Sequence, residues 1–539
     1  MTGRPFLRQP AILAVAAIGV SSTVFLGYLA HLTSSAHLLV YHFPGKPSAI
    51  FVPVIADVLL LAAVCFAAFV FLRERSTRHR VFWSLILSIY PWIFVRNFFN
   101  ILQVRVPRAV SLAIFALSAA GFLLLTLVRS DAMNRAFVEL QKFGVTMFVA
   151  SGIVGTLALL EATWFGVKAR HLNDPPVVEA VVRPANIAPH GRVLWIVLDE
   201  LGYRQLYESR LPDLELPAFD RVRGESTVFT DVQPAGFDTD IVLPALMTGD
   251  AVNRIRSTAD GRLVIHDARG WRLFDEHDTV FSDANALGYR SAVVGWFNPY
   301  CRILATMLDS CLWVNHSAIE GFGSNRGIAL SLLHPVAVFA SRLPRFFGFN
   351  KKTLPLDRQE EGQRHIEEFM ELNKAADAAL SDSRNNFLLV HMPIPHPEGI
   401  WERKTGQFAI DLSSYVDNLA LADAYLGHVR DLLEANGQWD GTTVVIMGDH
   451  ALRTAIWKDL PSWSGDDQLA SDGDKFDQRP AYLIKLPYQH TPAIVQAAFP
   501  AVRTRALLDE LLEGGITSPA QLKQWVSSGE LSSGSPAVN

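Results

Sequence analysis

The sequence predicts a chain with two parts, an α-helical transmembrane domain of five spans followed by an α/β/α sandwich. Five long apolar stretches lie within residues 1–170, whereas short apolar runs alternate with amphipathic stretches after residue 192. The first 170 residues carry 15 Lys and Arg against 5 Asp and Glu, which leaves 33 against 48 in the rest of the 539-residue chain. A basic, apolar part thus precedes an acidic part that has the composition of a soluble domain.

The five apolar stretches have the length of membrane-spanning helices. They cover residues 11–32, 49–72, 81–103, 109–128 and 143–165, and about 20 apolar residues suffice to cross the hydrocarbon core. The third stretch is the weakest, because Pro91 interrupts it and Arg96 follows its uncharged part. A buried or re-entrant helix is the alternative for that stretch. The first stretch is too long for a signal peptide, so we expect it to be an uncleaved anchor.

The charges between the stretches favour one orientation. Segments 4–8, 73–80 and 129–142 together hold nine Lys and Arg, whereas the two other connections hold four. Because cytoplasmic segments are the richer in Lys and Arg, the bias predicts a cytoplasmic N-terminus. Five crossings then place the acidic part on the periplasmic or extracytoplasmic side of the inner (plasma) membrane. That acidic part would repel phosphate backbones, so we expect no nucleic-acid partner.

The soluble part reads as alternating strands and helices. Predicted strands cover residues 192–198, 290–296, 386–390, 442–447 and 481–484, and long helices cover 364–380 and 415–435. Such alternation favours a largely parallel sheet covered by helices on both faces. We therefore divide the chain into a transmembrane domain (1–170), a linker (171–192), an α/β domain (193–505) and a C-terminal helix with a flexible tail (506–539).

Two of the three cysteines, Cys301 and Cys311, lie in the α/β domain, and Cys65 lies in the second apolar stretch. Outside the cytoplasm the first two would meet an oxidising environment. The sequence leaves both a disulfide and two free thiols open.

Acidic and imidazole side chains follow three of the predicted strands: Asp199 and Glu200, His391 and His396, and Asp449 and His450. Ligands bind at the carboxyl ends of strands in such sheets. A single acid there is commonly a turn residue or helix cap, but three strands deliver polar groups to one edge. Carboxylate oxygens with an imidazole suit one Zn²⁺ or Mn²⁺ ion. We expect Asp199, Glu200, Asp449 and His450 to be its ligands.

These segments resemble the sulfatase-like branch of the alkaline phosphatase superfamily, and within it the membrane-bound phosphoethanolamine and glycerol-phosphate transferases. Asp199 and Glu200, followed by Leu-Gly, match the paired-acid strand end of sulfatases. Asp449 and His450 resemble the Asp-His pair of the transferases, and residues 391–397 resemble the segment with their phosphate-binding histidine. The resemblance covers roughly residues 190–500 and implies a sandwich of the alkaline phosphatase/sulfatase type. The paired acid departs from the single glutamate of the transferases.

The resemblance also points to a nucleophile. Sulfatases carry a Cys or Ser, later converted to formylglycine, nine residues before a Thr-Gly pair; here Thr239 stands nine residues before Thr248. Pro244, five residues after Thr239, fits the transferases. A threonine cannot become formylglycine, so the resemblance implies that Thr239 binds the metal and attacks phosphorus. A helix N-cap is the alternative role for Thr239. Thr248 is the competing hydroxyl, which we expect to be structural.

Other polar residues have weaker assignments. We expect His396 to orient the phosphoryl group or protonate a leaving oxygen. His391 is expected to support the site or bind substrate. Arg453 and Arg479 are candidates for binding phosphate oxygens, with surface salt bridges as the alternative. Two acids flank the candidate nucleophile and are expected to be solvated turn residues, Asp238 and Asp240.

Together these features imply a metal-dependent phosphotransferase. It would move a phospholipid headgroup phosphate, of the phosphoethanolamine or phosphoglycerol type, to an envelope glycan or lipid acceptor through a phosphothreonine at Thr239. An active site beside a bilayer favours a lipid donor. One alternative is a membrane-tethered phosphatase or phosphodiesterase, in which water resolves the same intermediate. Another is a non-catalytic sulfatase-like envelope module, which would lose nucleophile or metal residues that this sequence keeps.

Overall fold

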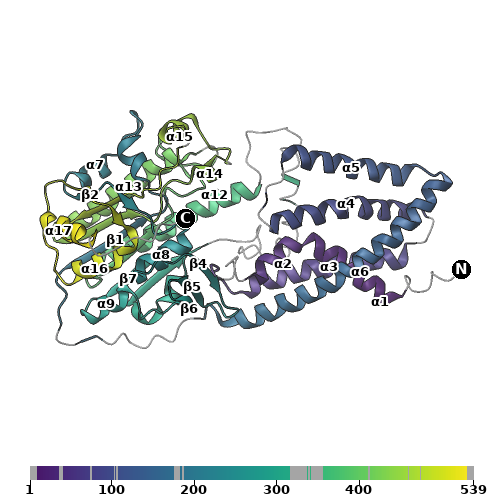
Figure 1. The fold of residues 1–539 in the computed structure, drawn as a ribbon, viewed down its shortest axis with the longest axis horizontal. Coiled ribbons are helices and arrows are strands. Elements are labelled where there is room, and N and C mark those ends of the chain that lie inside the picture. The colour runs from purple at the N-terminus through teal and green to yellow at the C-terminus, as the bar shows by residue number, and fades with distance from the viewer. Residues whose placement is uncertain are drawn as a thin grey trace.

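The computed structural model describes residues 9–530 except 35–40, 73–75, 102–103, 105–106, 175–182, 185–186, 316–336, 338–339, 342–355, 411–412, 459 and 474. A bundle of helices and an α/β domain follow one another along the long axis of the molecule (Figure 1). Both parts of the predicted fold are therefore present, in the predicted order. Residues 175–182 and 185–186 of the predicted linker, and residues 531–539 of the predicted tail, lie outside the described residues.

The helical domain contains six described helices: α1 (Pro10–Val24), α2 (Leu26–Thr33), α3 (Ser48–Phe71), α4 (Thr77–Ile101), α5 (Arg108–Leu127) and α6 (Asp131–Lys168). Four of these are long and apolar enough to cross a membrane, or five spans result if α1 and α2 count as one. The first predicted stretch is not straight, because α1 and α2 meet at a bend of 77°. In contrast, Pro91 lies inside α4 without ending it.

Small residues let the described helices pack closely. A Cβ at Gly152 of α6 would lie 2.0 Å from the Val15 carbonyl oxygen of α1, and one at Gly19 would lie 1.9 Å from that of Phe148. Close approach through small residues is typical of helix contacts in membranes. Large apolar side chains remain on the outside, where Leu117 is 72% and Leu160 63% exposed. Lipid is the environment that such a surface fits.

An eight-stranded sheet forms the centre of the second domain, in the order β14-β2-β13-β12-β1-β9-β7-β8. Its strands are β1 (Arg192–Leu198), β2 (Thr227–Phe229), β7 (Ser291–Trp296), β8 (Ser310–Val314), β9 (Phe387–Met392), β12 (Thr442–Gly448), β13 (Tyr482–Lys485) and β14 (Ala493–Val495). All five predicted strands are present. The stretch β12-β1-β9-β7-β8 is parallel throughout, whereas β13 runs antiparallel to β12 and β2.

Helices cover both faces of this sheet, which confirms the predicted α/β/α sandwich. One face packs against α7 (Pro217–Arg223), α12 (Leu356–Ser381) and α13 (Tyr415–Ala435). The other packs against α8 (Thr239–Thr248), α9 (Val280–Ala286), α16 (Thr504–Leu512) and α17 (Pro519–Glu530). Successive side chains of a strand point to opposite faces, so Leu194 and Ile196 of β1 enter the first layer while Val193 and Trp195 enter the second.

Shorter elements border this sandwich. They are a three-stranded sheet of β4 (Arg254–Ser257), β5 (Leu263–Asp267) and β6 (Gly270–Leu273), the pairs β3 (Val232–Gln233) with β15 (Phe499–Pro500) and β10 (Trp401–Glu402) with β11 (Gln407–Phe408), and the helices α10 (Tyr300–Ile303), α14 (Thr454–Trp457) and α15 (Gly465–Ala470). Cys301 and Cys311 form a disulfide that ties α10 to β8. Of the two arrangements left open by the sequence, the structure has the disulfide.

Candidate functional site

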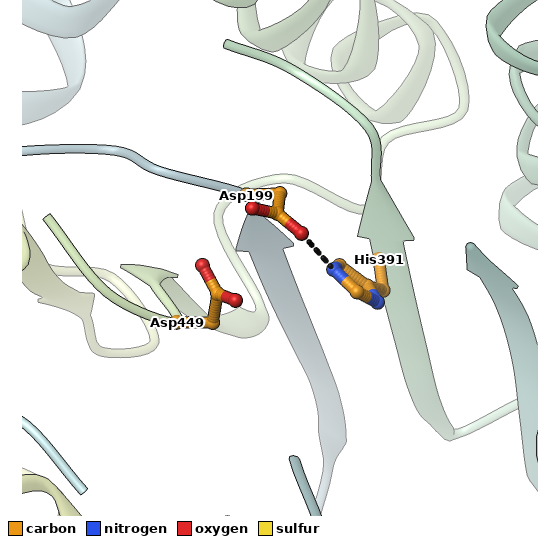
Figure 2. Close-up of side chains that lie close together, drawn as sticks. All are labelled: Asp199, His391 and Asp449. Carbon is orange, nitrogen blue, oxygen red and sulfur yellow. Dashed lines mark ion pairs between the residues drawn. The ribbon is translucent and has the colours of Figure 1, made fainter. Parts of the chain in front are cut away.

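Three neighbouring strands bring the predicted strand-end residues together. Asp199 directly follows β1 and Asp449 directly follows β12, while His391 is the second-last residue of β9. The register places Leu198 opposite both Gly448 and Met392, so the three strands end at the same level. Figure 2 shows the Asp199 and Asp449 side chains beside one another at this edge, with His391 facing Asp199. These three side chains and that of His450 are fully buried.

Thr239 enters the site from the start of α8. Its Oγ1 lies 3.0 Å from Oδ2 of Asp199 and 2.9 Å from Oδ2 of Asp449. A hydroxyl has one proton to donate, so it satisfies only one of these two carboxylates at a time. Asp238 occupies the N-cap position of α8, and its side chain makes no capping hydrogen bond. The Thr239 hydroxyl therefore faces the two acids and does not act as a helix cap.

Two imidazoles complete the cluster. His391 Nε2 lies 3.6 Å from Asp199 Oδ2, and His450 Nε2 lies 3.3 Å from Asp449 Oδ2. The other ring nitrogens are held by neighbours, His391 Nδ1 by the Tyr300 hydroxyl at 2.8 Å and His450 Nδ1 by the Ala451 carbonyl at 3.0 Å. Metal-binding histidines are commonly oriented in this way through the second nitrogen.

The electrostatics of the cluster favour a cation. Burial, together with the nearby Asp449 carboxylate, raises the pKa of Asp199 well above its usual range. Burial lowers the pKa of His391 to about 4. Although burial opposes it, the carboxylates of Asp449 and Asp199 raise the pKa of His450. Two adjacent buried carboxylates repel each other, and a bound cation relieves that repulsion.

The described donor atoms fit a divalent metal. Ligand atoms of Asp199, His391 and Asp449 all lie within 4.8 Å of one another. Asp199 Oδ1, His391 Nε2 and His450 Nε2 are buried without a hydrogen-bond partner, and buried polar atoms rarely remain unpaired. His391 Nε2 and His450 Nε2 each lie 3.6 Å from an oxygen of Asp199, so the residues present fit an ion with oxygen and nitrogen ligands. Zinc and manganese both accept such a set.

Glu200 was expected to be a metal ligand, but in the structure its carboxylate is bound by other side chains. Its backbone has φ of 68°, a left-handed conformation that non-glycine residues rarely adopt. Its carboxylate accepts hydrogen bonds from Arg453 Nε and, at 2.7 Å, from Trp457 Nε1. The geometry therefore favours His391, which the sequence placed in a supporting or substrate-binding role, over Glu200 as a metal ligand.

Thr239 lines a cavity of about 700 Å³. Of the other site residues expected from the sequence, some line this cavity and one lies at the surface. His396 and Arg453 line it. Burial and the nearby Arg453 lower the pKa of His396 well below its usual range, so the side chain is neutral at neutral pH. Arg479 is not part of the described lining and instead pairs with Glu208 and Asp477.

Other residues that line the cavity were not indicated by any pattern in the sequence. Trp271 and two exposed arginines, Arg254 and Arg256, come from the three-stranded sheet. Arg256 stacks over the Trp271 ring at 4.3 Å. Trp296 and Phe297 come from the end of β7. Thr248, by contrast, donates to the Pro244 carbonyl at the far end of α8, as a structural hydroxyl would.

The fold and this site define a protein of the alkaline phosphatase superfamily that carries candidate transmembrane helices. The sulfatase family model matches residues 192–488, more than half of the chain, and the chain belongs to the sulfatase family. No protein of curated function matches it.

Solved structures similar to the chain include the phosphonate monoester hydrolase of Agrobacterium radiobacter, at 14% identity over 60% of this chain and 74% of that one, with a TM-score of 0.36. The lipoteichoic acid synthase LtaP of Listeria monocytogenes is similar at 14% identity over 65% and 79%, with a TM-score of 0.34. Ps i-CgsB, in complex with k-i-k-neocarrahexaose, is similar at 15% identity over 63% and 76%, with a TM-score of 0.39. At these identities and TM-scores, the three structures say nothing about the activity of this chain.

Proposed function

We propose that the protein is a phosphotransferase that moves a phospholipid headgroup phosphate onto an acceptor hydroxyl of the cell envelope through Thr239. One observation carries the proposal: the Thr239 hydroxyl lies within 3.0 Å of two buried strand-end carboxylates at the foot of the cavity. A threonine held only for packing would not need two buried acids as neighbours of its hydroxyl. The sulfatase family match supports ester chemistry at this edge of the sheet.

Asp199, Asp449, His450 and His391, with Thr239 itself, are the residues that would hold one Zn²⁺ or Mn²⁺ ion. When bound, such an ion lowers the pKa of the threonine hydroxyl and neutralises charge on phosphate oxygens. Glu200 was expected among the ligands from the sequence. In our proposal Glu200 instead holds Arg453, which lines the cavity and would bind phosphate oxygens there.

The reaction has two displacements. The Thr239 oxygen attacks the phosphorus of the donor, the bond from phosphorus to the diacylglycerol oxygen breaks, and that oxygen takes a proton. An acceptor hydroxyl then attacks the phosphothreonine, and Thr239 recovers its hydroxyl. His396 remains neutral because of its lowered pKa, which favours orienting the phosphoryl group over donating the proton.

A lipid donor is supported by where the cavity lies. A Cβ at Gly261, in the β4–β5 turn, would meet Leu172, just beyond α6, at 2.0 Å, so the three-stranded sheet touches the end of the helical domain. Arg254, Arg256 and Trp271 of that sheet line the cavity. Arginines bind phosphate oxygens, and tryptophan is enriched at membrane interfaces.

The test is product analysis with the full-length protein in lipid nanodiscs that contain headgroup-labelled phosphatidylethanolamine or phosphatidylglycerol. We expect diacylglycerol release, with the label on Thr239 and then on an added acceptor, and the mass of the Thr239 adduct identifies the transferred group. Label recovered as free headgroup phosphate would instead identify a phosphodiesterase. Complete absence of turnover and adduct would favour a non-catalytic module.

We further propose that the α/β domain lies outside the cytoplasm, in the periplasm or its equivalent. Arg80, at the start of α4, donates to the backbone carbonyls of Leu125 and Val128. The start of α4 and the end of α5 therefore lie together, at the end of the bundle away from the α/β domain (Figure 1). By the positive-inside bias that end faces the cytoplasm.

A reporter fused after residue 180 tests this orientation. We expect alkaline phosphatase activity from the fusion and no fluorescence from a matched green fluorescent protein fusion. The reverse result would mean that α1 and α2 re-enter the membrane without crossing it, or that the whole domain is inverted.

A further inference from the structure

The connection between α2 and α3 joins the helical domain to the α/β domain. Phe43 packs among helix residues such as Leu32 and Phe51. Two residues earlier, Tyr41 is 1% exposed and packs against Ala245 of α8 and Ile265 of β5. The short segment thus has one aromatic side chain buried in each domain.

His42, between these two aromatics, reaches the first turn of the helix that carries Thr239. Its Nε2 lies 2.8 Å from Oδ1 of Asp240, although the two atoms lack the alignment of a hydrogen bond. Its Nδ1 donates to the Phe297 carbonyl at 2.9 Å, and the two rings stack with centroids 4.1 Å apart. His42 is 5% exposed. Asp240, expected from the sequence to be a solvated turn residue, is therefore partly covered by a side chain from the helical domain.

The partners of His42 belong to the active-site cavity. Asp240 and Phe297 both line it, as does Thr239. Since the N-cap residue Asp238 makes no capping hydrogen bond, the first turn of α8 depends on tertiary contacts for its orientation. One such contact joins Asn298 Nδ2 to the Thr239 carbonyl at 3.5 Å, near the limit of a hydrogen bond. The contact of His42 with Asp240 is shorter.

Arg302 of α10 contacts this segment through a hydrogen bond and through one of its aromatic rings. Arg302 donates to the Tyr41 carbonyl and lies over the rings of Tyr41 and Trp313, at 5.4 Å and 5.5 Å. The neighbouring Cys301 is tied to Cys311. A cross-linked α10 therefore presents the arginine that holds the segment.

We infer that His42 is a positioning residue for Thr239, supplied to the active site by the helical domain. By fixing Asp240 and Phe297 together, it sets the angle at which the Thr239 oxygen enters between Asp199 and Asp449. The helical domain is then part of the catalytic apparatus as well as an anchor. This inference rests on the proposed role of Thr239 as nucleophile.

The experiment compares His42→Ala and His42→Gln with the wild type, as full-length protein in nanodiscs that contain the phospholipid donor. We expect His42→Ala to lower kcat about 10- to 100-fold, because small misplacements of a reacting group cost rate on that scale. KM and bound metal should stay within about twofold, since no metal or substrate ligand is removed. His42→Gln, which keeps a donor near Asp240, should recover part of kcat.

The matched control is His171→Ala. His171 also pairs with an aspartate, Asp174, at 2.6 Å and also lies near the junction of the domains, but its side chain is 69% exposed and is not part of the described cavity lining. We expect wild-type turnover from this variant. A double substitution of His42 and Asp240 to alanine should lower kcat no further than the Asp240 change alone, because coupled neighbours are not additive.

Wild-type kcat in His42→Ala would overturn the inference. So would a loss of activity accompanied by loss of metal and no recovery in His42→Gln, because that pattern indicates a general structural role. Failure of the proposed function is distinguishable, since the wild-type protein itself would then form no phosphothreonine. The mass of the intact protein after exposure to donor separates the two cases.

Discussion

Replacing Thr239 by alanine should reduce turnover by several orders of magnitude per folded molecule. The substitution removes the hydroxyl that lies within 3.0 Å of both the Asp199 and the Asp449 carboxylate, and losing a covalent nucleophile has effects of that size in other enzymes. The four other candidate metal ligands remain, so the protein should fold and bind metal, more weakly. Thr239→Ser should retain part of the activity, because a primary hydroxyl occupies the same place. Turnover and the phosphothreonine adduct, measured by mass spectrometry, check both variants.

Thr248→Ala is the matched control for this prediction. Thr248 lies at the other end of the same helix and donates to the Pro244 carbonyl within it. Its loss should cost about 1 kcal/mol of stability and leave turnover per folded molecule near the wild-type value. Near-normal turnover in Thr239→Ala itself would end the covalent mechanism, and the residue would then serve only the packing of α8.

Asp449→Asn should abolish both stoichiometric metal binding and turnover. The change keeps the shape of the side chain but removes one of two buried carboxylate charges, and metal affinity depends on ligand charge. Metal content per folded protein is measured by mass spectrometry of the elements, and turnover is measured during titration with Zn²⁺ or Mn²⁺. Treatment of the wild-type protein with a chelator should have the same effect and be reversed by one of these ions. Full metal content with normal turnover in Asp449→Asn would contradict the proposed site.

Two further substitutions decide which residue completes the ligand set. His391→Ala should lower metal content, because His391 Nε2 is unpaired and points at Asp199. Glu200→Gln should keep the metal and lower the unfolding temperature, because the buried carboxylate pairs with Arg453 and accepts from Trp457. The opposite pattern would restore Glu200 as the ligand that the sequence led us to expect.

Features set by local patterns were open to prediction from the sequence. Apolar length and charge placed the helical domain, and alternation of strands and helices placed the sandwich. Because parallel strands end at one edge, residues directly after strands, such as Asp199 and Asp449, were expected to meet, and in the structure they do. The resemblance to sulfatases and transferases, through the spacing of Thr239 to Pro244 and Thr248, drew attention to Thr239, whose catalytic role stays a prediction.

Tertiary packing decided the rest, since it depends on backbone direction and on contacts far apart in sequence. Glu200 directly follows Asp199, yet its left-handed φ of 68° turns the carboxylate to Arg453, 253 residues away. The antiparallel course of β13 and the 77° bend between α1 and α2 leave no mark in an apolar pattern. His42 meets the Phe297 carbonyl across 255 residues. Hydrophobic periodicity reports which face of an element is buried, whereas the partner on that face is chosen only when the whole chain packs.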